Sequence, residues 1–440
     1  MAGDTRFSLD SVAPGPGLPG SGLSWLNALR QDARGRFDAK GFPSPRDEEW
    51  KYTNVAAIER RSFKPAIDGI VSNAVAPDTI SRYRLDDAWS LVLVDGVFRP
   101  DLSTLGTEFD GLSAGPLSSA LAVEPERLKA TLGHALAAEP HGFLAYNTAF
   151  FAEGLYLRVA RGSVIERPIQ VLNISTQGSA AVNLRNLYVL EPGSRARVVE
   201  TFVGQPESGA LTVSVSEALV AEGAELGCTL LQNESERGFL FSGLYATIGR
   251  DARLGHDNLS LGGLLVRNEI HVSLDANSSC SLNGLFVGRN RRHVDNHTLI
   301  HHHGPNGVSR EQYRGILADR SRGVFQGRIV VHPDAQKTDA QMNNRNLLLS
   351  DDAEVDTKPQ LEIHADDVKC AHGVAIGQLD PESVFYLESR GIDSAAARNM
   401  LSFAFANAMI EQLELTGVRN LARDELLAQF PQSGIRKDWL

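Results

Sequence analysis

The stretch EPGSRARVVETFVGQPESGALTVSVSEALVAEGAELGC, residues 191–228, contains the pattern that governs most of this chain. Two β-prone runs, 197–203 and 211–220, are separated by small and acidic residues, and the turn EPGSRARV at 191 returns as AEGAELGC at 221. Related turns follow as GRDARLGH at 249 and DANSSCSL at 275. The four starts recur at similar intervals, and repeats of roughly 20–50 residues are typical of solenoids and arrays.

Strands in this arrangement predict a parallel β-helix, also called a β-solenoid. A short strand with apolar residues at alternate positions cannot bury that face alone, whereas stacked coils share a core and satisfy the backbone ladder. Gly or Asp in each turn supplies a tight corner. The alternative, a β-sandwich or jelly roll, would need hairpin signals about every 8–12 residues, and these are mostly missing. We therefore expect a mainly β fold.

The succession of short β-prone runs extends from about 146 to about 380, and helical patterns flank it. Residues 1–22 are rich in Gly, Pro and Ser, so we expect a disordered tail there. The predicted division is a mainly helical N-terminal domain over 23–145, a β-helix core over 146–380 and a C-terminal helical domain over 381–440. A chain of 440 residues, too long for one ordinary core, fits several units.

Two helix starts stand out after the β-prone region. Asp380 followed by Pro381 and an acidic residue predicts an N-cap and a first helical turn. Asp393 predicts the cap of a longer helix over 394–414, and a last helix is expected over 420–429. We expect these helices to cap the open end of the solenoid, where unpaired strand edges would otherwise be exposed.

Composition excludes several classes of function. The formal net charge of −11 repels phosphate backbones, so no nucleic-acid partner is expected. No run of about 18 apolar residues predicts a membrane span, and the first residues show no basic segment followed by an apolar stretch, so no signal peptide is expected. Three scattered cysteines fit a reducing compartment, so we expect a cytoplasmic protein.

Two short functional motifs are absent from the sequence. It contains no G-x-x-x-x-G-K-[ST] phosphate loop and no C-x-x-C pair. Its GPGLPG at 15–20 matches G-x-G-x-x-G but follows no strand. Three scattered cysteines cannot ligate an iron–sulfur cluster with thiolates alone unless another chain helps.

The sharpest local signal is Cys370 and His372 in HADDVKCAHG. Residues two apart on a strand point to the same side, so the thiol and the imidazole would be neighbours. The imidazole could activate the thiol as a nucleophile, or both groups could ligate iron or zinc. The plain alternative is a buried core cysteine beside an unrelated histidine. Cys228 and Cys280, inside β-prone runs, are expected to fill the core.

A second candidate is a group of three histidines around one predicted strand. His297, His301 and His303 lie at odd positions and would share one face of a straight strand. Three imidazoles on one face can bind zinc or iron. The alternative is that they are exposed or turn histidines, since Gly304 and Pro305 follow and no carboxylate is obviously placed to support a metal.

The run QMNNRNLLLSDDAEVDTKPQLEIHADDVKCAHGVAIGQLDPESVFYLESRGI at 341–392 resembles the SufB/SufD family, the scaffold subunits of the Suf iron–sulfur cluster assembly system. EEWKYTN at 48–54 resembles the N-terminal segment of SufD-type members. The resemblance spans roughly residues 20–435. It implies a β-helix between two helical domains, as the repeat predicted independently.

The resemblance also implies partners and a shared site. SufD-type and SufB-type subunits pair, and each binds a SufC-type ATPase through its C-terminal helical region, here 381–440. The cluster is thought to form at their interface, where the SufB side supplies a cysteine and a glutamate and the SufD side supplies the histidine that matches His372. Cys370 would be its supporting thiol. With no cysteine after Cys370, the chain fits the SufD type better.

We therefore expect a non-catalytic assembly subunit that acts in iron acquisition and in cluster assembly or transfer. The isolated chain should bind no cofactor tightly and could form a homodimer, whereas the complex would hold iron or an iron–sulfur cluster transiently. The alternatives are a SufB-type scaffold, a β-helix carbohydrate-active enzyme and a histidine-based metalloenzyme using the three histidines named above.

Overall fold

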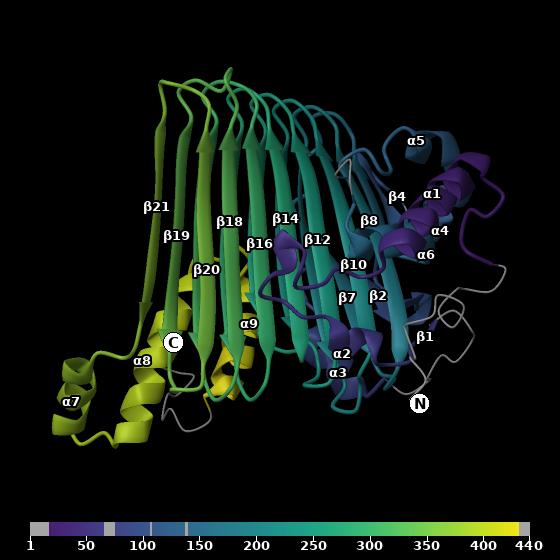
Figure 1. The fold of residues 1–440 in the computed structure, drawn as a ribbon. Coiled ribbons are helices and arrows are strands. Elements are labelled where there is room, and N and C mark those ends of the chain that lie inside the picture. Colours follow the sequence, from purple (N-terminus) through teal and green to yellow (C-terminus); the bar gives the residue numbers. More distant parts are fainter. Residues whose placement is uncertain (1–16, 66–74, 106–107, 137–139, 431–440) are drawn as a thin grey trace.

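The computed structural model describes residues 17–65, 75–105, 108–136 and 140–430. Most of the predicted disordered tail, residues 1–16, lies outside this part. Two long sheets form the walls of a β-helix, and the chain alternates between them, so that strands two apart in sequence are neighbours in one sheet (Figure 1). Neighbouring strands of the coils run parallel, which confirms the predicted fold class and rules out the sandwich.

The first sheet carries the even-numbered strands of the coils. Among the described residues it contains β1 (Lys64–Pro65), β4 (Glu108–Phe109), β5 (Leu112–Pro116), β6 (Leu155–Val159), β8 (Ala180–Leu190), β10 (Leu211–Val220), β12 (Phe239–Ile248), β14 (Leu265–Leu274), β16 (His293–His302), β18 (Arg322–Val331) and β20 (Glu354–Ile363).

The second sheet carries the odd-numbered strands of the coils. Within the described ranges this sheet contains β2 (Trp89–Val94), β3 (Val97–Phe98), β7 (Ile169–Ser175), β9 (Arg195–Gly204), β11 (Glu225–Asn233), β13 (Arg253–Ser260), β15 (Ser279–Gly288), β17 (Val308–Leu317), β19 (Asp339–Leu348) and β21 (Lys369–Gly377).

Helices lie before and after the coils. They are α1 (Ser24–Lys40), α2 (Ala56–Glu59), α3 (Pro77–Tyr83), α4 (Leu117–Val123), α5 (Pro125–Lys129), α6 (Gly142–Phe150), α7 (Pro381–Ser389), α8 (Ser394–Ile410) and α9 (Thr416–Gln429), with 3-10 turns η2 (Glu48–Trp50) and η3 (Pro100–Leu102). Between α6 and α7, a stretch that the structure describes throughout, the chain forms no helix.

The sequence repeat corresponds to one coil of the solenoid. Arg195, Glu225, Arg253 and Ser279 are paired in register on β9, β11, β13 and β15. Each of them lies four positions after the start of one repeated turn, at 191, 221, 249 and 275. The interval between the turns is therefore the length of chain that passes once through both sheets.

A left-handed residue forms the corner before each second-sheet strand from β9 to β19. Gly193 and Gly223 have φ of 69° and 66°, and Asp251 and Asn277 each have 58°. Asn306 and Lys337 continue the series. Gly, Asn and Asp adopt this conformation more readily than other residues, so the predicted use of Gly and Asp at the corners is confirmed.

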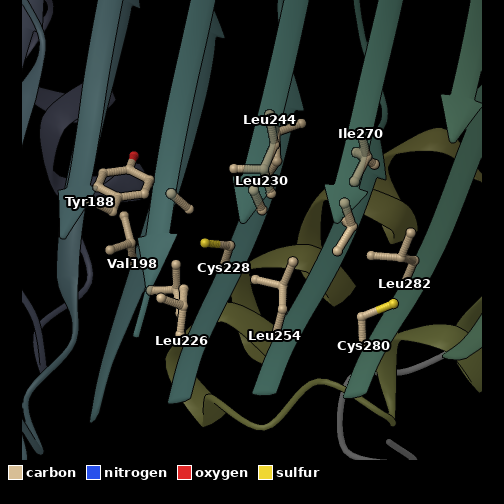
Figure 2. Packing of buried hydrophobic residues seen from close by; sticks show 14 of the residues in the cluster. Tyr188, Val198, Leu226, Cys228, Leu230, Leu244, Leu254, Ile270, Cys280 and Leu282 are labelled. Carbon is tan, nitrogen blue, oxygen red and sulfur yellow. The ribbon is translucent and has the colours of Figure 1, made fainter. Parts of the chain in front are cut away.

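The main core lies inside the coils, between the two sheets. Figure 2 shows leucine, valine and isoleucine side chains from neighbouring strands packed there, together with Tyr188. Cys228 and Cys280 are 7% and 3% exposed and belong to this cluster, as expected for core-filling thiols. Burial raises the pKa of both thiols, which keeps them protonated and unreactive.

The N-terminal region contributes strands as well as helices. The predicted strand pair around Asp95-Gly96 is present as β2 and β3, and β2 also extends the second sheet by pairing with β7. Helix α1 lies against α6, and α6 packs on the outer face of β8 and β10. Because α6 spans Gly142–Phe150, the expected boundary at 145/146 falls within one helix.

The first two C-terminal helices, α7 and α8, begin where the sequence predicted, whereas α9 begins at Thr416, before the predicted start at 420. The Asp380 side chain accepts hydrogen bonds from the backbone N–H groups of Glu382 and Ser383 at 3.2 Å each. Asp393 accepts one from Ala396 at 3.0 Å.

Their position differs from the prediction, because they do not cap the open end of the solenoid. Phe403 and Met409 of α8 pack with Leu285 and Ile316 on the outer face of the second sheet. Leucine, isoleucine and valine side chains from several strands line that face, so a helix can bury its apolar side along it. The end of a single coil offers fewer apolar side chains for such packing.

None of the helices in the described ranges is both long enough and apolar enough to span a lipid bilayer.

Candidate functional site

The last coil, formed by β20 and β21, lies at one end of the β-helix (Figure 1). On β21, Cys370 lies opposite Ala340 and His372 lies opposite Met342 of β19. Ala340 and Met342 are buried in the core. Since side chains alternate along a strand, Cys370 and His372 both lie on the inner face of β21.

No further described coil covers these two side chains, and they differ in exposure. Cys370 is half-buried and packs against the core cluster, whereas His372 is exposed. Neither residue is sealed inside the solenoid. The thiol and the imidazole therefore lie where another chain can reach them.

The ionisation of Cys370 bears on the two chemistries that the sequence left open. Burial raises the pKa of the Cys370 thiol, and the nearby carboxylate of Asp339 raises it further, against a lowering hydrogen bond from the Ala340 backbone. A nucleophilic cysteine requires the opposite shift. The surroundings thus favour a protonated thiol over a nucleophilic thiolate.

The predicted histidine group is divided by the structure. His301 and His303 lie together, and they are joined by His332 from the next coil, which the sequence pattern did not single out. The ligand nitrogens of these three residues all lie within 4.8 Å of one another. His297, by contrast, faces a separate network on the same sheet, so the expected trio of His297, His301 and His303 is not one site.

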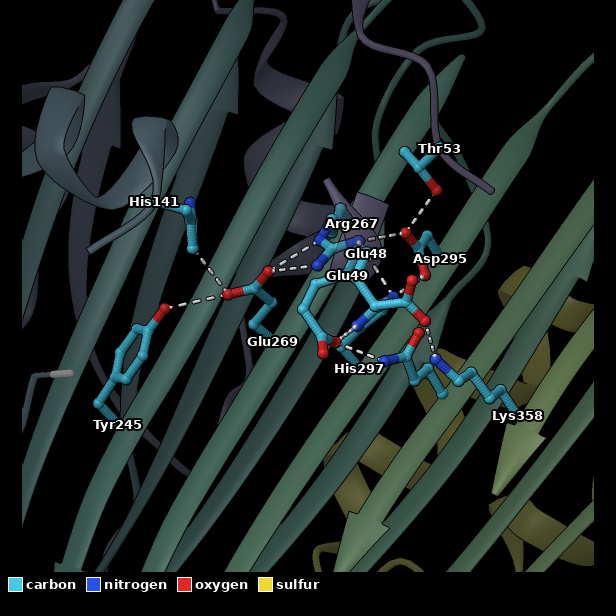
Figure 3. Close-up of polar contacts among 11 residues, drawn as sticks. Glu48, Glu49, Thr53, His141, Tyr245, Arg267, Glu269, Asp295, His297 and Lys358 are labelled. Atoms are coloured by element: carbon cyan, nitrogen blue, oxygen red, sulfur yellow. Dashed lines mark hydrogen bonds and ion pairs between the residues drawn. The ribbon is translucent and has the colours of Figure 1, made fainter. Parts of the chain in front are cut away.

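His297 belongs to a buried ionic network on β14 and β16 (Figure 3). Arg267 forms ion pairs of 2.6 Å with both Glu269 and Asp295, and His297 Nε2 lies 2.9 Å from Asp295 Oδ1. Burial alone would raise the pKa of Asp295, but His297 and Arg267 outweigh it and lower that pKa. The His297 imidazole is therefore held by its ion pair with Asp295 and does not join the other histidines.

The EEWKYTN segment docks on this network. The Trp50 ring centroid lies 3.6 Å from the Arg267 guanidinium carbon, a cation–π contact. Thr53 Oγ1 donates a 2.5 Å hydrogen bond to Asp295, and Lys358 of β20 pairs with Glu48 at 2.6 Å. The segment thus ties the N-terminal region to the outer face of the first sheet across several coils (Figure 3).

The end coil also exposes apolar side chains. Ile363 on β20 is 41% exposed, and Val374 and Ile376 on β21 are 42% and 50% exposed. Val374 and Ile376 lie at alternate positions from His372, on the same inner face of β21. Within the described chain, β20 and β21 each pair with a strand on one side only. An open edge of this kind is a template for pairing with another strand.

Family comparisons agree with this architecture. The family model described as "SUF system FeS cluster assembly, SufBD core domain" matches residues 173–405, and "SufBD protein N-terminal region" matches residues 20–171. The chain therefore belongs to the SufB/SufD family of iron–sulfur cluster assembly proteins.

Within that family the chain is SufD-like. It is 32% identical to the iron–sulfur cluster assembly protein SufD of Escherichia coli strain K12, with 89% of each chain covered. An iron–sulfur cluster assembly SufBD family protein of Synechocystis is 27% identical over 92% of this chain and 91% of its own. The chloroplastic protein ABCI7 of Arabidopsis thaliana is 28% identical over 94% and 87%.

Proposed function

We propose that the chain is the SufD-type subunit of a SufB–SufC–SufD complex, and that it acts in iron acquisition and in cluster assembly or transfer at its interface with a SufB-type partner. The observation that carries this proposal is the open end coil. It combines unpaired strand edges, exposed apolar side chains and the Cys370–His372 pair on one strand.

A second β-helix is the occupant that this end fits best. The two free edges run for 10 residues on β20 and 9 residues on β21, so a partner with the same coil shape could continue both sheets. Its side chains would cover Val374 and Ile376, which the described chain leaves half-exposed. A paralogue built on the same repeat meets this requirement, and a homodimer of the isolated chain would use the same edges.

Cys370 and His372 would form half of the cluster site. Iron–sulfur clusters are usually held by four ligands, mostly thiolates, and this strand supplies one thiol and one imidazole. We assign His372 the role of interface ligand or proton handler and Cys370 that of supporting thiol, with the remaining ligands supplied by the partner. The isolated chain would then bind neither iron nor a cluster tightly, and it would not act as an enzyme.

The ATPase of the complex would dock on the C-terminal helical region. The sequence carries no phosphate-loop motif of its own, so nucleotide hydrolysis must come from another subunit. Helix α7 carries two exposed aromatic residues, Phe385 at 70% and Tyr386 at 57%, and it extends away from the coils (Figure 1). Exposed aromatic side chains of this type are common anchors of protein interfaces.

The test is reconstitution of the complex with His372→Ala. The chain is combined with a SufB-type partner, a SufC-type ATPase, ATP, ferrous iron and a sulfide donor, and cluster formation is followed by visible absorbance and iron content. We expect the variant complex to assemble normally but to form no cluster, because one ligand of the shared site is gone.

The matched control is His134→Ala, which removes an imidazole remote in sequence from the end coil. It should leave cluster formation unchanged. If His372→Ala forms clusters at the rate of the unaltered complex, the role assigned to His372 is wrong.

A further inference from the structure

Three imidazoles meet at one corner of the coils, apart from the Cys370–His372 strand. His301 lies near the end of β16, His303 directly follows that strand, and His332 follows β18 in the next coil. His301 Nδ1 and His332 Nε2 are 3.1 Å apart. The ring centroids of His303 and His332 are 4.3 Å apart, and those of His301 and His303 are 5.6 Å apart.

The register of the solenoid creates this cluster. His302 pairs with Val331 in the parallel ladder, so the residues that follow them, His303 and His332, occupy the same corner of successive coils. The backbone N–H of His364 bonds to Val331 O one coil later, which continues the row towards the end coil. His301 lies two positions before His303 and therefore on the same face.

The surroundings keep these imidazoles available as ligands. His301 and His332 are half-buried and His303 is exposed, so solvent can reach this corner of the coils. Two carboxylates act on the cluster, Glu362 on His301 and Asp275 on His303. The positive charge of Arg328 would repel a bound cation, but its guanidinium forms an ion pair of 2.7 Å with Glu362, which offsets that charge.

We propose that His301, His303 and His332 together bind one divalent first-row transition-metal ion of the zinc or ferrous class. Neutral imidazole is a preferred ligand of such ions, and three protein ligands with one open position form a known tetrahedral arrangement. Imidazole nitrogens bound at about 2.0–2.1 Å would be roughly 3.3 Å apart, close to the 3.1 Å between His301 and His332.

Little rearrangement is required for the third ligand. His303 is exposed, so its side chain can rotate towards the other two without disturbing the core. Metal binding would replace the contact between His301 and His332, and water or an exogenous ligand would take the fourth position. The proposal is independent of the function proposed for the end coil, because none of its ligands lies on β21.

The test uses Co²⁺ as a spectroscopic probe on the full chain. A C370A/H372A background removes the end-coil ligands, so that any binding reports on the histidine cluster alone. We expect one equivalent of Co²⁺ to give the intense visible bands of tetrahedral coordination and Zn²⁺ to displace it. His303→Ala and His332→Ala should each weaken binding at least tenfold, while His134→Ala should not change it.

Circular dichroism melts of the metal-free variants would establish that they fold. His303→Ala is the decisive variant here, because an exposed side chain can be removed without disturbing the fold. Binding that is unaffected by both cluster substitutions, or no binding at all by the folded C370A/H372A chain, would overturn the proposal. Cluster formation by the reconstituted complex is measured separately, so the two proposals can fail independently.

Discussion

Glu311 is a carboxylic acid held inside the β-helix. It lies on β17 opposite the core residue Leu282, is 1% exposed, and accepts a hydrogen bond from the Thr298 hydroxyl. Burial raises its pKa to about 7, against the lowering effect of Thr298. The folded protein thus keeps a proton on Glu311 at pH values where the unfolded chain has released it.

The first prediction concerns Glu311→Gln and pH. Between the unfolded pKa of 4.5 and the folded pKa of about 7, the folded state binds the extra proton, so this residue makes stability fall as pH rises. The variant lacks this effect. Relative to the original protein, its free energy of unfolding should increase by up to about 3 kcal/mol from pH 4.5 to pH 8.

Urea unfolding at several pH values measures the difference between the two proteins. Thr298→Val, which removes the hydroxyl but keeps the carboxyl, is the control and should retain the fall in stability with pH. A free-energy difference between Glu311→Gln and the original chain that stays constant across this range would contradict a raised pKa for Glu311.

At the scale of single residues, sequence reasoning reached part of each candidate site. Alternation along a strand correctly indicated that Cys370 and His372 share a face. It also grouped His297 with His301, which lies four positions later on the same strand. The structure separates them, because His297 pairs with Asp295 whereas His301 contacts His332. His332 was missed because it lies one full coil after His303 in the chain, and only the register of the coils brings them together.

At the scale of the element, β21 is the part of the chain on which the proposed assembly depends. Its inner face combines His372 with Val374 and Ile376, and its outer edge has no strand neighbour in the described residues. These apolar side chains contribute little to the folded subunit, because they are about half-exposed. Their burial against a partner would be worth roughly 25 cal/mol per Å² of apolar area removed from water.

The second prediction follows from this exposure. The double variant Val374→Asp and Ile376→Asp should fold with near-normal stability. It should lose binding to a SufB-type partner, and any self-association, because two carboxylates would have to be buried in the interface. Size-exclusion chromatography with light scattering measures both associations.

Val123→Asp is the matched control, since this valine on α4 is 78% exposed and lies far from the end coil in sequence. It should not affect association. A double variant that is folded by circular dichroism and still binds the partner at full affinity would show that the complex forms through another surface.

At the scale of the whole molecule, the β-helix is a nearly one-dimensional stack. Each coil touches only the coils before and after it, so local stability depends on having two neighbours. The coil of β20 and β21 has one neighbour among the described residues, and most of its side chains are exposed or half-exposed. The central coils are covered on both sides, and α6 and α8 pack on their outer faces.

The third prediction is a gradient of hydrogen exchange. Amides of β20 and β21 should exchange faster than those of β10–β13, and binding of a SufB-type partner should slow exchange at the end coil specifically. Mass spectrometry of peptides from both regions measures this. Uniform protection along the coils, or protection on partner binding that avoids β20 and β21, would contradict the end-coil interface.

The local features of this protein follow from residues that are neighbours in the chain. The regular return of the turns, the corner residues and the caps Asp380 and Asp393 are encoded in neighbouring positions, where backbone preference and alternation act directly. These features were enough to predict the solenoid and the helices after it.

The contacts that cross from one coil to another depend on the folded chain as a whole. The fold placed α8 on the outer face of the second sheet and left the end coil open, it united His332 with His301 and His303, and it set Trp50 on Arg267. Each of these contacts joins residues separated by a coil or more. Such contacts depend on strand register and on which apolar faces meet, and these follow from the packing of the whole chain instead of from any local run of residues.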